Sequence, residues 1–243
     1  MFEPDVHSTS LILWKEANVD RRLEICDILK RHYRHIVAGV QVIHQVEESS
    51  VRSENYRVAY TPMRRGSDPY LLVRRNILNT PDELRAGTLV MEYLRGQDIL
   101  VPELILTHDG DTFVQHDGSY WQVFAFQSGD HFAGADAQLV EVVKTIARMH
   151  VVLRGFPMKD VVPRIDDIIG PLDAGYWDRI HDLRGENGFE HMLHAQKRFI
   201  TDGVLTVADA LKEISQVEAV NHGDIHPHNI LIPWDGGLPV IID

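Results

Sequence analysis

The chain has 243 residues, of which 44% are hydrophobic and 25% are charged, and its formal net charge at pH 7 is −12. This composition is typical of a globular protein and excludes an intrinsically disordered chain. The negative charge argues against nucleic acid as a partner, because binding a phosphate backbone requires a basic face. No apolar run approaches the roughly 18 residues of a membrane span, so we expect no membrane partner.

Cysteine usage and the first residues indicate the cellular compartment. Cys26 is the only cysteine, so no disulfide can form within the chain. Residues Met1–Asp5 lack the basic and apolar blocks of a signal peptide. Both features predict a protein of the reducing cytoplasm. Nothing in the sequence pattern predicts a particular oligomeric state.

The first part of the chain predicts a helix followed by strands. Apolar residues recur at helical spacing between residues 19 and 35, which indicates an amphipathic helix. The residues expected on its inward face are Leu23, Ile25, Cys26, Ile28, Leu29 and Tyr33. From residue 36 to residue 75 the pattern changes to that of β-strands, most clearly at 56–60 and 70–73.

A second helix is predicted to begin after Thr80 and to run to about Gly96. Thr80 is suited to the N-cap and Pro81 to the first helical position, and Glu83 is spaced to close a capping box with Thr80. The residues expected to point inward are Leu84, Leu89, Val90, Met91 and Leu94.

The remaining elements are two strands and two helices. The strands are predicted over residues 103–107 and 120–126, the second of them after a turn at Asp117-Gly118. Beyond Gly129 the pattern becomes helical, with amphipathic segments over 137–152 and 204–217. The inward face of the first segment is predicted to contain Leu139, Val142, Val143, Ile146 and Met149.

This layout predicts an α+β enzyme of two lobes with its site in the cleft between them. The first lobe, residues 1–127, combines the N-terminal helix with a β-rich region. The second lobe, residues 128–243, is mainly helical. The predicted hinge is the polar segment Gln127-Ser128-Gly129.

The chemically informative segment runs from His222 to Ile232 and is followed by the apolar residues before Asp243. Phosphoryl transfer needs oxygen ligands for a divalent metal, and a carboxylate that orients the attacking hydroxyl and accepts its proton. Asp224 and Asn229 have the spacing of a kinase catalytic loop, and Asp243 ends an apolar strand after a glycine-rich turn. The four fixed residues of H-G-D-x-x-x-x-N arise by chance on the order of once in a thousand chains of this length. We therefore expect Asn229 and Asp243 to approach each other across a two-stranded ribbon.

At these residues the sequence resembles the superfamily of aminoglycoside phosphotransferases and choline kinases. The resemblance implies a protein-kinase-like fold and a kinase that uses ATP or GTP, with Mg²⁺, to phosphorylate a hydroxyl of a small molecule. It implies that Asp224 is the catalytic base and that Asn229 and Asp243 are the metal ligands, while His222 is expected to orient the loop backbone. The acceptor expected from the resemblance is an amino sugar or aminoglycoside, another sugar, or an amino alcohol.

The resemblance extends more weakly into the first lobe. Ser53 and Asn55 fall in a stretch similar to the family's nucleotide-loop signature. Arg74 falls at the position of the basic residue that binds the nucleotide phosphates. Phe124 and Phe126 lie in the stretch where the family contacts the base, mainly through backbone groups.

The sequence departs from the family pattern at three points. The loop over residues 47–53 contains no glycine, although the corresponding loop of the family is usually glycine-rich. The basic residue is an arginine, either Arg74 or Arg75; the two face opposite sides of a strand, and the register favours Arg74. The glutamate that normally pairs with this basic residue falls near Gly87, and Glu83 is the nearest substitute.

Two other functions are weighed against the kinase. His222, His226 and His228 could form a zinc site, but Pro227 interrupts the helical spacing that would bring two of them to one metal. The absent glycines and the displaced glutamate would suit a pseudokinase that binds nucleotide and acts as a binding module. The intact catalytic-loop motif favours the kinase.

The C-terminus carries one further expectation. The chain stops at Asp243, directly after the apolar run 240–242. Members of the family that the chain resembles continue beyond this aspartate with helices that complete the larger lobe. We therefore expect the C-terminal lobe to be incomplete and acceptor-dependent turnover to be low.

Overall fold

The structure is a computed structural model in which residues 14–46, 52–63, 69–162, 191, 195–196 and 220–242 are described. The chain divides into two compact units, the first formed by Met1–Phe156 with Val220–Asp243 and the second by Pro157–Ala219. The described part of the second unit includes one short 3-10 helix, η1 (Lys159–Val161). The lobe boundary predicted between residues 127 and 128 stays a prediction, and the helix predicted over 204–217 lies outside the described residues.

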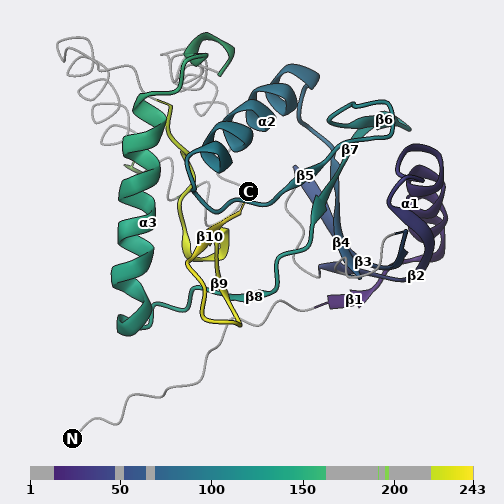
Figure 1. Cartoon of the computed structure of the whole chain (residues 1–243), viewed down its shortest axis with the longest axis horizontal. Helices are drawn as coiled ribbons and strands as arrows, with labels where there is room; N and C mark the ends of the chain where they lie inside the picture. Colours follow the sequence, from purple (N-terminus) through teal and green to yellow (C-terminus); the bar gives the residue numbers. More distant parts are fainter. Residues whose placement is uncertain are drawn as a thin grey trace, which may run out of the picture. The chain divides into compact units, whose positions relative to one another are not determined.

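The first unit contains a seven-stranded antiparallel sheet (Figure 1). Its strands, in order across the sheet, are β1 (Trp14–Glu16), β2 (Val37–Val46), β3 (Ser53–Pro62), β4 (Tyr70–Asn76), β7 (Ser119–Ala125) and β5 (Leu104–Ile105), and β6 (Val114–His116) pairs with β7. The strands predicted within 36–75, 103–107 and 120–126 are confirmed. The sequence does not predict β1 and β6, because three residues are too few for a recognisable alternation.

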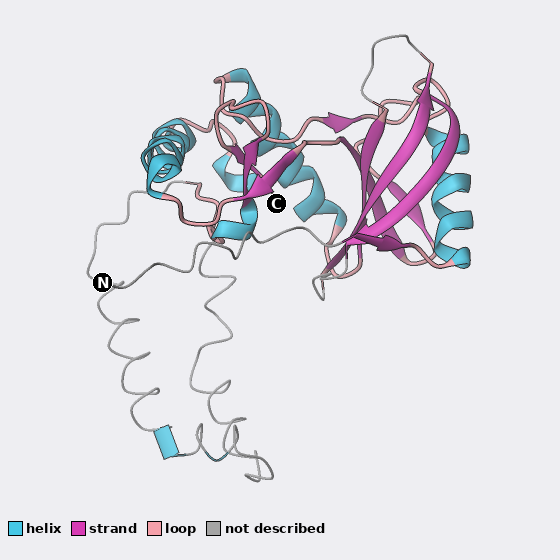
Figure 2. Cartoon of the chain, turned by 90° about the horizontal axis from the view of Figure 1, so that it is seen from below, coloured by secondary structure: helices cyan, strands magenta, loops and turns pink. Residues whose placement is uncertain are grey.

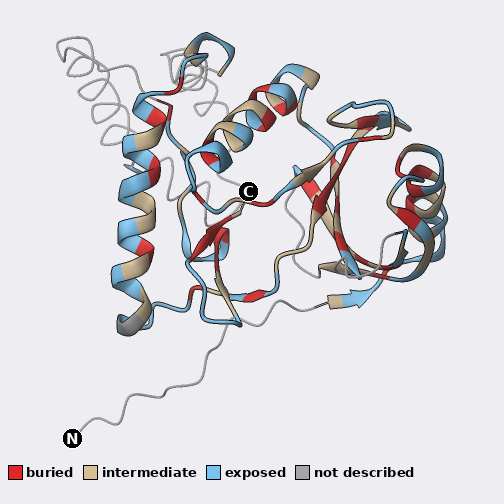
Figure 3. Cartoon of the chain, viewed as in Figure 1, coloured by how far each residue is buried: buried red, intermediate tan, exposed pale blue. Residues whose placement is uncertain are grey.

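Helix α1 (Val19–His32) lies against one face of this sheet (Figure 2). Its residues Ile25, Ile28 and Leu29 are buried as predicted, and Figure 3 shows this buried stripe facing the strands. The core that they share with the sheet includes Ile43, Tyr56, Val58, Leu71, Val73, Trp121 and Val123. The prediction for Leu23 is wrong, because its side chain is 66% exposed. Two residues correspond to about 200° of helical rotation, so Leu23 and Ile25 point in nearly opposite directions.

Helix α2 (Pro81–Gly96) begins as its sequence predicts. The Thr80 hydroxyl accepts a hydrogen bond from the Glu83 amide at 3.3 Å, and the Thr80 amide donates to Glu83 Oε2 at 2.6 Å. Leu84 and Leu94 are buried, as predicted. The prediction fails in part for three consecutive residues that are only half-buried, Leu89, Val90 and Met91. Three consecutive residues spread over about 200° of a helix, so they cannot all face one core.

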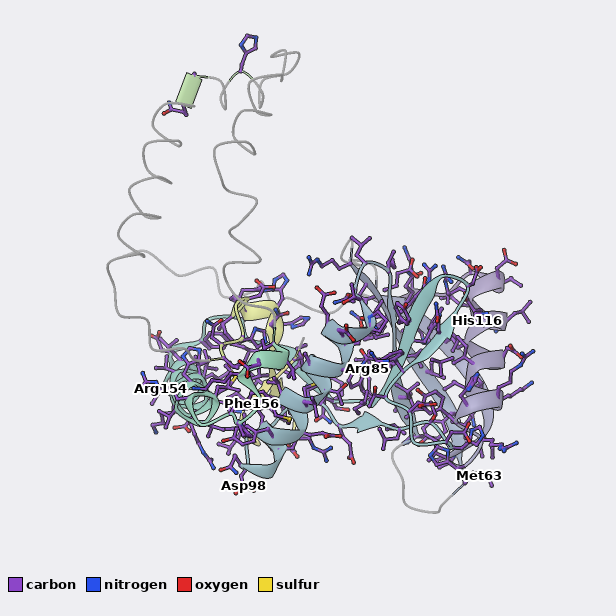
Figure 4. All side chains as sticks on the ribbon, turned by 90° about the horizontal axis from the view of Figure 1, so that it is seen from above. Met63, Arg85, Asp98, His116, Arg154 and Phe156 are labelled. Carbon is purple, nitrogen blue, oxygen red and sulfur yellow. The ribbon has the colours of Figure 1, made fainter. Side chains whose placement is uncertain are left out.

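The hairpin that joins β6 to β7 confirms the predicted turn. Asp117 has φ 44° and Gly118 has φ 71°, the left-handed pair that a two-residue hairpin turn requires. His116, at the end of β6, is labelled in Figure 4 on the side of the sheet where α1 lies. Its Nε2 is 3.8 Å from Glu24 Oε1 of that helix.

The remaining elements of the first unit are helix α3 (Asp136–Arg154) and a second sheet. This sheet has the order β10 (Val240–Ile241), β9 (Ile230–Pro233) and β8 (Gly129–His131), all antiparallel. The residue Phe156, which follows α3 and is labelled in Figure 4, packs edge-on against Tyr93 of α2 with ring centroids 5.3 Å apart. The Tyr93 hydroxyl also donates to the Val152 carbonyl at 3.4 Å.

The predicted inward face of α3 is confirmed only in part. Val142 and Met149 are buried, and Ile146 is half-buried. Leu139 is 43% exposed and Val143 is 55% exposed. Val143 is rotated by about 100° from Val142, and Leu139 lies in the first turn of the helix. None of the described helices combines the length and the apolar character that a membrane span requires.

Candidate active site

The motif around Asp224 forms a tight loop in front of β9. Gly223 has φ 77°, a left-handed conformation that a residue with a side chain adopts only at a cost, so glycine is required here. A short 3-10 helix, η3 (Pro227–Asn229), then leads directly into β9. The loop therefore turns twice within a few residues and brings the Asn229 side chain back to the backbone of Asp224.

Asn229 and Asp224 are joined by hydrogen bonds. The Asn229 Nδ2 donates to the Asp224 backbone carbonyl at 2.9 Å and lies 3.4 Å from Asp224 Oδ2. Asn229 is buried, with 7% of its surface exposed, whereas the Asp224 side chain is 77% exposed. The loop thus holds a fixed amide beneath a carboxylate that remains accessible to a reactant.

The ribbon of β9 and β10 brings the C-terminal end of the described chain to Asn229. Ile241 pairs with Ile230, and the Ile242 amide donates to the Asn229 carbonyl at 2.9 Å. The predicted ribbon is therefore present up to residue 242. Asp243, the second predicted metal ligand, lies outside the described residues.

His226 lies beside the exposed carboxylate and is the first of three histidine rings in contact with one another. His226 Nε2 is 3.6 Å from Asp224 Oδ2, and the His226 ring meets the His228 ring edge-on with centroids 5.7 Å apart. The His228 ring stacks on His131 of β8 at 5.3 Å. Burial, followed by the neighbouring His228, lowers the pKa of His131. His222 lies at the start of the motif, and both its ring nitrogens are shielded from solvent.

The oxygen atoms of the catalytic loop are the candidate ligands for a metal ion. Among the residues described, no three His, Cys, Asp or Glu side chains are grouped as a metal centre. The Asn229 amide donates through its nitrogen to Asp224, which leaves its oxygen for another partner. An amide oxygen beside carboxylates is the hard oxygen donor set that Mg²⁺ binds. The donors of the catalytic loop therefore fit this ion.

The first-lobe residues gather on the sheet face opposite α1. Arg74 Nε donates to Asn55 Oδ1 at 2.9 Å, and the Arg74 guanidinium lies 5.6 Å from the centre of the Phe124 ring. Ser53 pairs in register with Asn76 at the end of the same strands and is buried. Ser53, Asn55, Arg74 and Phe124 thus lie on three adjacent strands. The loop residues 47–51 lie outside the described part of the chain.

Arg75 lies on the other face of β4. Its Nη1 is 3.3 Å from Glu54 Oε2, and its guanidinium lies 5.9 Å from the centre of the Trp121 ring, beneath α1. The hydroxyl of Tyr56 donates to Glu54 Oε2 at 2.7 Å, and burial raises the pKa of Tyr56. The two arginines therefore have different surroundings, as strand alternation predicts.

The substitution of Glu83 for the missing helix glutamate is not supported by the geometry. The Glu83 carboxylate is engaged in the capping box with Thr80. The Arg74 side chain instead donates to Asn55. The cap explains the difference, because the first turn of a helix binds an acidic side chain through its free amides.

A profile of the phosphotransferase enzyme family matches residues 44–243, most of the chain. The chain belongs to this phosphotransferase enzyme family. The match includes the catalytic loop and the strands that contain Asn55, Arg74 and Phe124. The family consists of small-molecule kinases, which is the enzyme class expected from the sequence.

Solved structures similar to this phosphotransferase share its fold. One is a spectinomycin phosphotransferase in complex with ADP and spectinomycin, at 14% identity and TM-score 0.58, over 90% of this chain and 70% of that one. Another is a thermostable mutant of an aminoglycoside phosphotransferase with ADP and hygromycin B, at 14% identity and TM-score 0.61, over 93% and 70%. A third is an amicoumacin kinase with AMP-PNP and Ca²⁺, at 14% identity and TM-score 0.56, over 91% and 64%. The predicted two-lobed, protein-kinase-like fold is confirmed. No curated protein matches the chain.

Several residues near the phosphotransferase site were not predicted from the sequence. Strand β8 brings His131 to the catalytic loop, and Gly129 allows this because a Cβ there would lie 2.6 Å from the Ile232 carbonyl oxygen. Phe126, predicted near the base, contacts Tyr70 and Arg57. Arg57 follows Asn55 by two residues in β3, so strand alternation puts both on one face. The sequence could have indicated Arg57 in this way, because Asn55 was already predicted to bind nucleotide.

Proposed function

We propose that this phosphotransferase transfers the γ-phosphoryl group of ATP or GTP to a hydroxyl of a small molecule. The observation that carries the proposal is the loop geometry, in which buried Asn229 is hydrogen-bonded to Asp224 while the Asp224 carboxylate stays exposed. Such a carboxylate can reach an acceptor hydroxyl, and the amide beneath it fixes its position. Positioning of this kind, together with electrostatic stabilisation, supplies most of the catalysis in phosphoryl transfer.

In the proposed reaction Asp224 is the general base. Its carboxylate accepts a hydrogen bond from the acceptor hydroxyl and then the proton, as the acceptor oxygen forms a bond to the γ-phosphorus. The bond between the γ-phosphorus and the bridging oxygen breaks, and the nucleoside diphosphate leaves with that electron pair. His226, 3.6 Å from Asp224 Oδ2, is placed to hold the carboxylate in position.

Asn229 and Asp243 are the residues proposed to hold Mg²⁺. When bound, the ion would neutralise charge on the phosphate oxygens. The hydrogen bond from Asn229 Nδ2 to Asp224 leaves the amide oxygen available as a ligand. The hydrogen bond from the Ile242 amide to the Asn229 carbonyl supports the proposal that Asp243, the next residue, lies near Asn229.

Arg74, Asn55 and Ser53 are proposed to bind the phosphates. The bond from Arg74 Nε to Asn55 uses one edge of the guanidinium, and a guanidinium has five donors in a planar fork suited to phosphate oxygens. Phe124 and Phe126 are proposed to lie beside the base. A nucleotide site of this kind is supported by solved structures of the same fold that contain ADP or AMP-PNP.

The acceptor is proposed to be an amino sugar or aminoglycoside, another sugar, or an amino alcohol. Spectinomycin and hygromycin B are present in two structures of the same fold. A formal charge of −12 attracts a cationic, amine-bearing acceptor more than an anionic one. The proposed location is the cytoplasm, where nucleoside triphosphates are available.

The test is direct phosphorylation of an acceptor panel. The protein is incubated with Mg²⁺ and ATP or GTP together with amino sugars, aminoglycosides, other sugars and amino alcohols, and products are identified by mass spectrometry. A phosphorylated acceptor that requires both protein and nucleotide is expected. The absence of glycine in residues 47–53 favours a second candidate, a pseudokinase. Tight nucleotide binding without any phosphorylated product would support that candidate.

A further inference from the structure

The side chain of Arg57, in the middle of β3, is surrounded by three aromatic rings. Its guanidinium carbon lies 5.1 Å from the ring centre of Trp14, 5.6 Å from that of Tyr70 and 5.9 Å from that of Phe126. The rings also meet one another, with centroids 6.2 Å apart for Trp14 and Phe126 and 6.0 Å apart for Tyr70 and Phe126. These four residues are called the Arg57 cluster.

The guanidinium of this cluster lacks a hydrogen-bond acceptor within the described chain. Arg57 Nε is buried and makes no hydrogen bond, and no ion pair between Arg57 and a described carboxylate is found. A guanidinium has five N–H donors, and a half-buried cation without an acceptor is unfavourable. Trp14 and Phe126 are half-buried and Tyr70 is 39% exposed, so the cluster still presents ring surface to solvent.

The position of the cluster relates it to the proposed phosphate site. Asn55 is opposite Arg74, and Arg57 is opposite Leu72. Arg57 therefore lies two residues, or roughly 7 Å, further along the same face than Asn55. Ser53 begins β3 opposite Asn76, and Arg74 lies two residues before that end of β4. A nucleotide whose phosphates lie at that end extends its base along β4 toward Arg57.

At the Ser53 end of the same face, two amide side chains are buried against each other. Asn76 Nδ2 donates to Gln122 Oε1 at 3.2 Å, and both residues are buried. Among the described residues of this face, the Arg57 cluster offers a base both ring surface and N–H donors without a protein acceptor. Planar bases stack well on aromatic rings, whichever base they are.

The donors of Arg57 distinguish between purines. Guanine presents two acceptors on one edge, N7 and O6, which match two N–H groups of a guanidinium. Adenine presents N7 beside an amino group that is itself a donor, so one of the two contacts becomes unfavourable. A cation with donors only thus favours guanine.

We infer that the Arg57 cluster binds the base of the donor nucleotide and selects guanine over adenine. This inference rests on the proposed function, because it needs the nucleotide phosphates at Arg74. Trp14, Tyr70 and Phe126 hold the guanidinium in place and provide the ring surface, and the terminal nitrogens of Arg57 contact N7 and O6.

If the Arg57 cluster had only a structural role, a different result would be expected. In that case Arg57 would only attach the edge strand β1 to the sheet through its contact with Trp14, and replacing it would lower thermal stability without altering base preference. Lysine separates the two roles, because it retains the charge over the rings but lacks the planar pair of donors. Arg57→Lys is thus the decisive variant, and Arg57→Gln removes the charge as well.

The experiment measures dissociation constants of GDP and ADP with Mg²⁺ by calorimetry. The proteins are the wild type, Arg57→Lys, Arg57→Gln, Arg74→Ala and the control Arg75→Gln, whose side chain lies on the opposite face of β4. The melting temperature of each variant is recorded to establish that it is folded. We expect the wild type to bind GDP roughly tenfold or more tightly than ADP. Both Arg57 variants should lose this preference, and Arg75→Gln should keep it.

Equal binding of both nucleotides by the wild type, a preference for ADP, or an unchanged preference in Arg57→Lys would overturn the inference. The Arg74→Ala variant and nucleotide binding by the wild type test the proposed function independently of base selection. If Arg74→Ala weakens both nucleotides while the Arg57 variants bind as the wild type does, only the inference about base selection is wrong. If the wild type binds neither nucleotide, both proposals fail.

Discussion

Arg74 and Arg75 are neighbours in sequence with different expected functions. Arg74 lies beside Asn55 and Phe124 on the face proposed to bind nucleotide, and Arg75 lies beside Glu54 beneath α1. We expect Arg74→Ala to raise the nucleotide dissociation constant by about tenfold or more, because a charge-assisted phosphate contact is lost.

Arg75→Ala should leave nucleotide binding nearly unchanged and lower the melting temperature instead. It removes a half-buried ion pair with Glu54 and a cation–π contact with Trp121. Calorimetric titration and thermal unfolding of both variants separate the two functions. The opposite ranking of nucleotide affinities would mean that the proposed phosphate-binding residue is misassigned.

His131 gives a prediction for the dependence of stability on pH. Burial and the nearby His228 lower its pKa in the folded protein below the ordinary value of 6.5. The unfolded chain therefore binds a proton at a higher pH than the folded protein does, and His131 lowers stability as the pH falls below about 6.5. Denaturant unfolding of the wild type and His131→Gln between pH 7.5 and 5 tests this. The variant should lose less stability over that interval, and an equal loss would contradict the assignment.

The proposed catalytic residues are easier to identify from the sequence than the residues that surround them. Asp224 and Asn229 belong to one short motif, so their spacing alone identified both as candidate site residues. His131 lies about a hundred residues earlier and reaches the loop only through the pairing of β8 with β9. Such long-range pairing depends on the tertiary structure, and a local pattern does not contain it.

The contact between β8 and β9 gives a prediction at the level of a single element. A Cβ at Gly129 would lie 2.6 Å from the Ile232 carbonyl oxygen, which is a backbone atom and cannot move independently. We expect Gly129→Ala to destabilise the protein by about 1–3 kcal/mol, the usual cost of overpacking. Denaturant unfolding measures this free energy.

Gly87 provides the matched control within α2. A Cβ at Gly87 meets no atom within 4 Å, and the residue lies inside a helix. Gly87→Ala should therefore stabilise the protein by roughly 0.5–1 kcal/mol. If both glycine variants changed stability by the same amount and sign, the close approach at β8 would be incorrect.

Element boundaries were predictable where local chemistry determines them. The start of α2 follows from Thr80, Pro81 and Glu83, and the structure contains both hydrogen bonds of the capping box. Which side chains face inward was predicted less well. Leu23 is apolar but exposed, because burial is decided by where the sheet lies rather than by hydrophobicity alone.

At the level of the whole molecule, the sequence predicted the α+β, protein-kinase-like fold. The β alternation in the first half and the helical pattern after Gly129 made this possible, together with the catalytic-loop motif. The pairing order of the strands, and the pairing of β8 with the predicted ribbon of β9 and β10, were not predictable from periodicity.

The central claim is that Asp224 is the base of a phosphoryl transfer and takes no part in holding the nucleotide. Asp224→Asn keeps the shape of the side chain and the backbone carbonyl that accepts from Asn229. The measurement is the turnover number with the best acceptor of the panel, together with the dissociation constant of the Mg²⁺-nucleotide complex, for wild type and variant. We expect the turnover number to fall by on the order of 100-fold or more while the dissociation constant changes little. Turnover close to that of the wild type would contradict it.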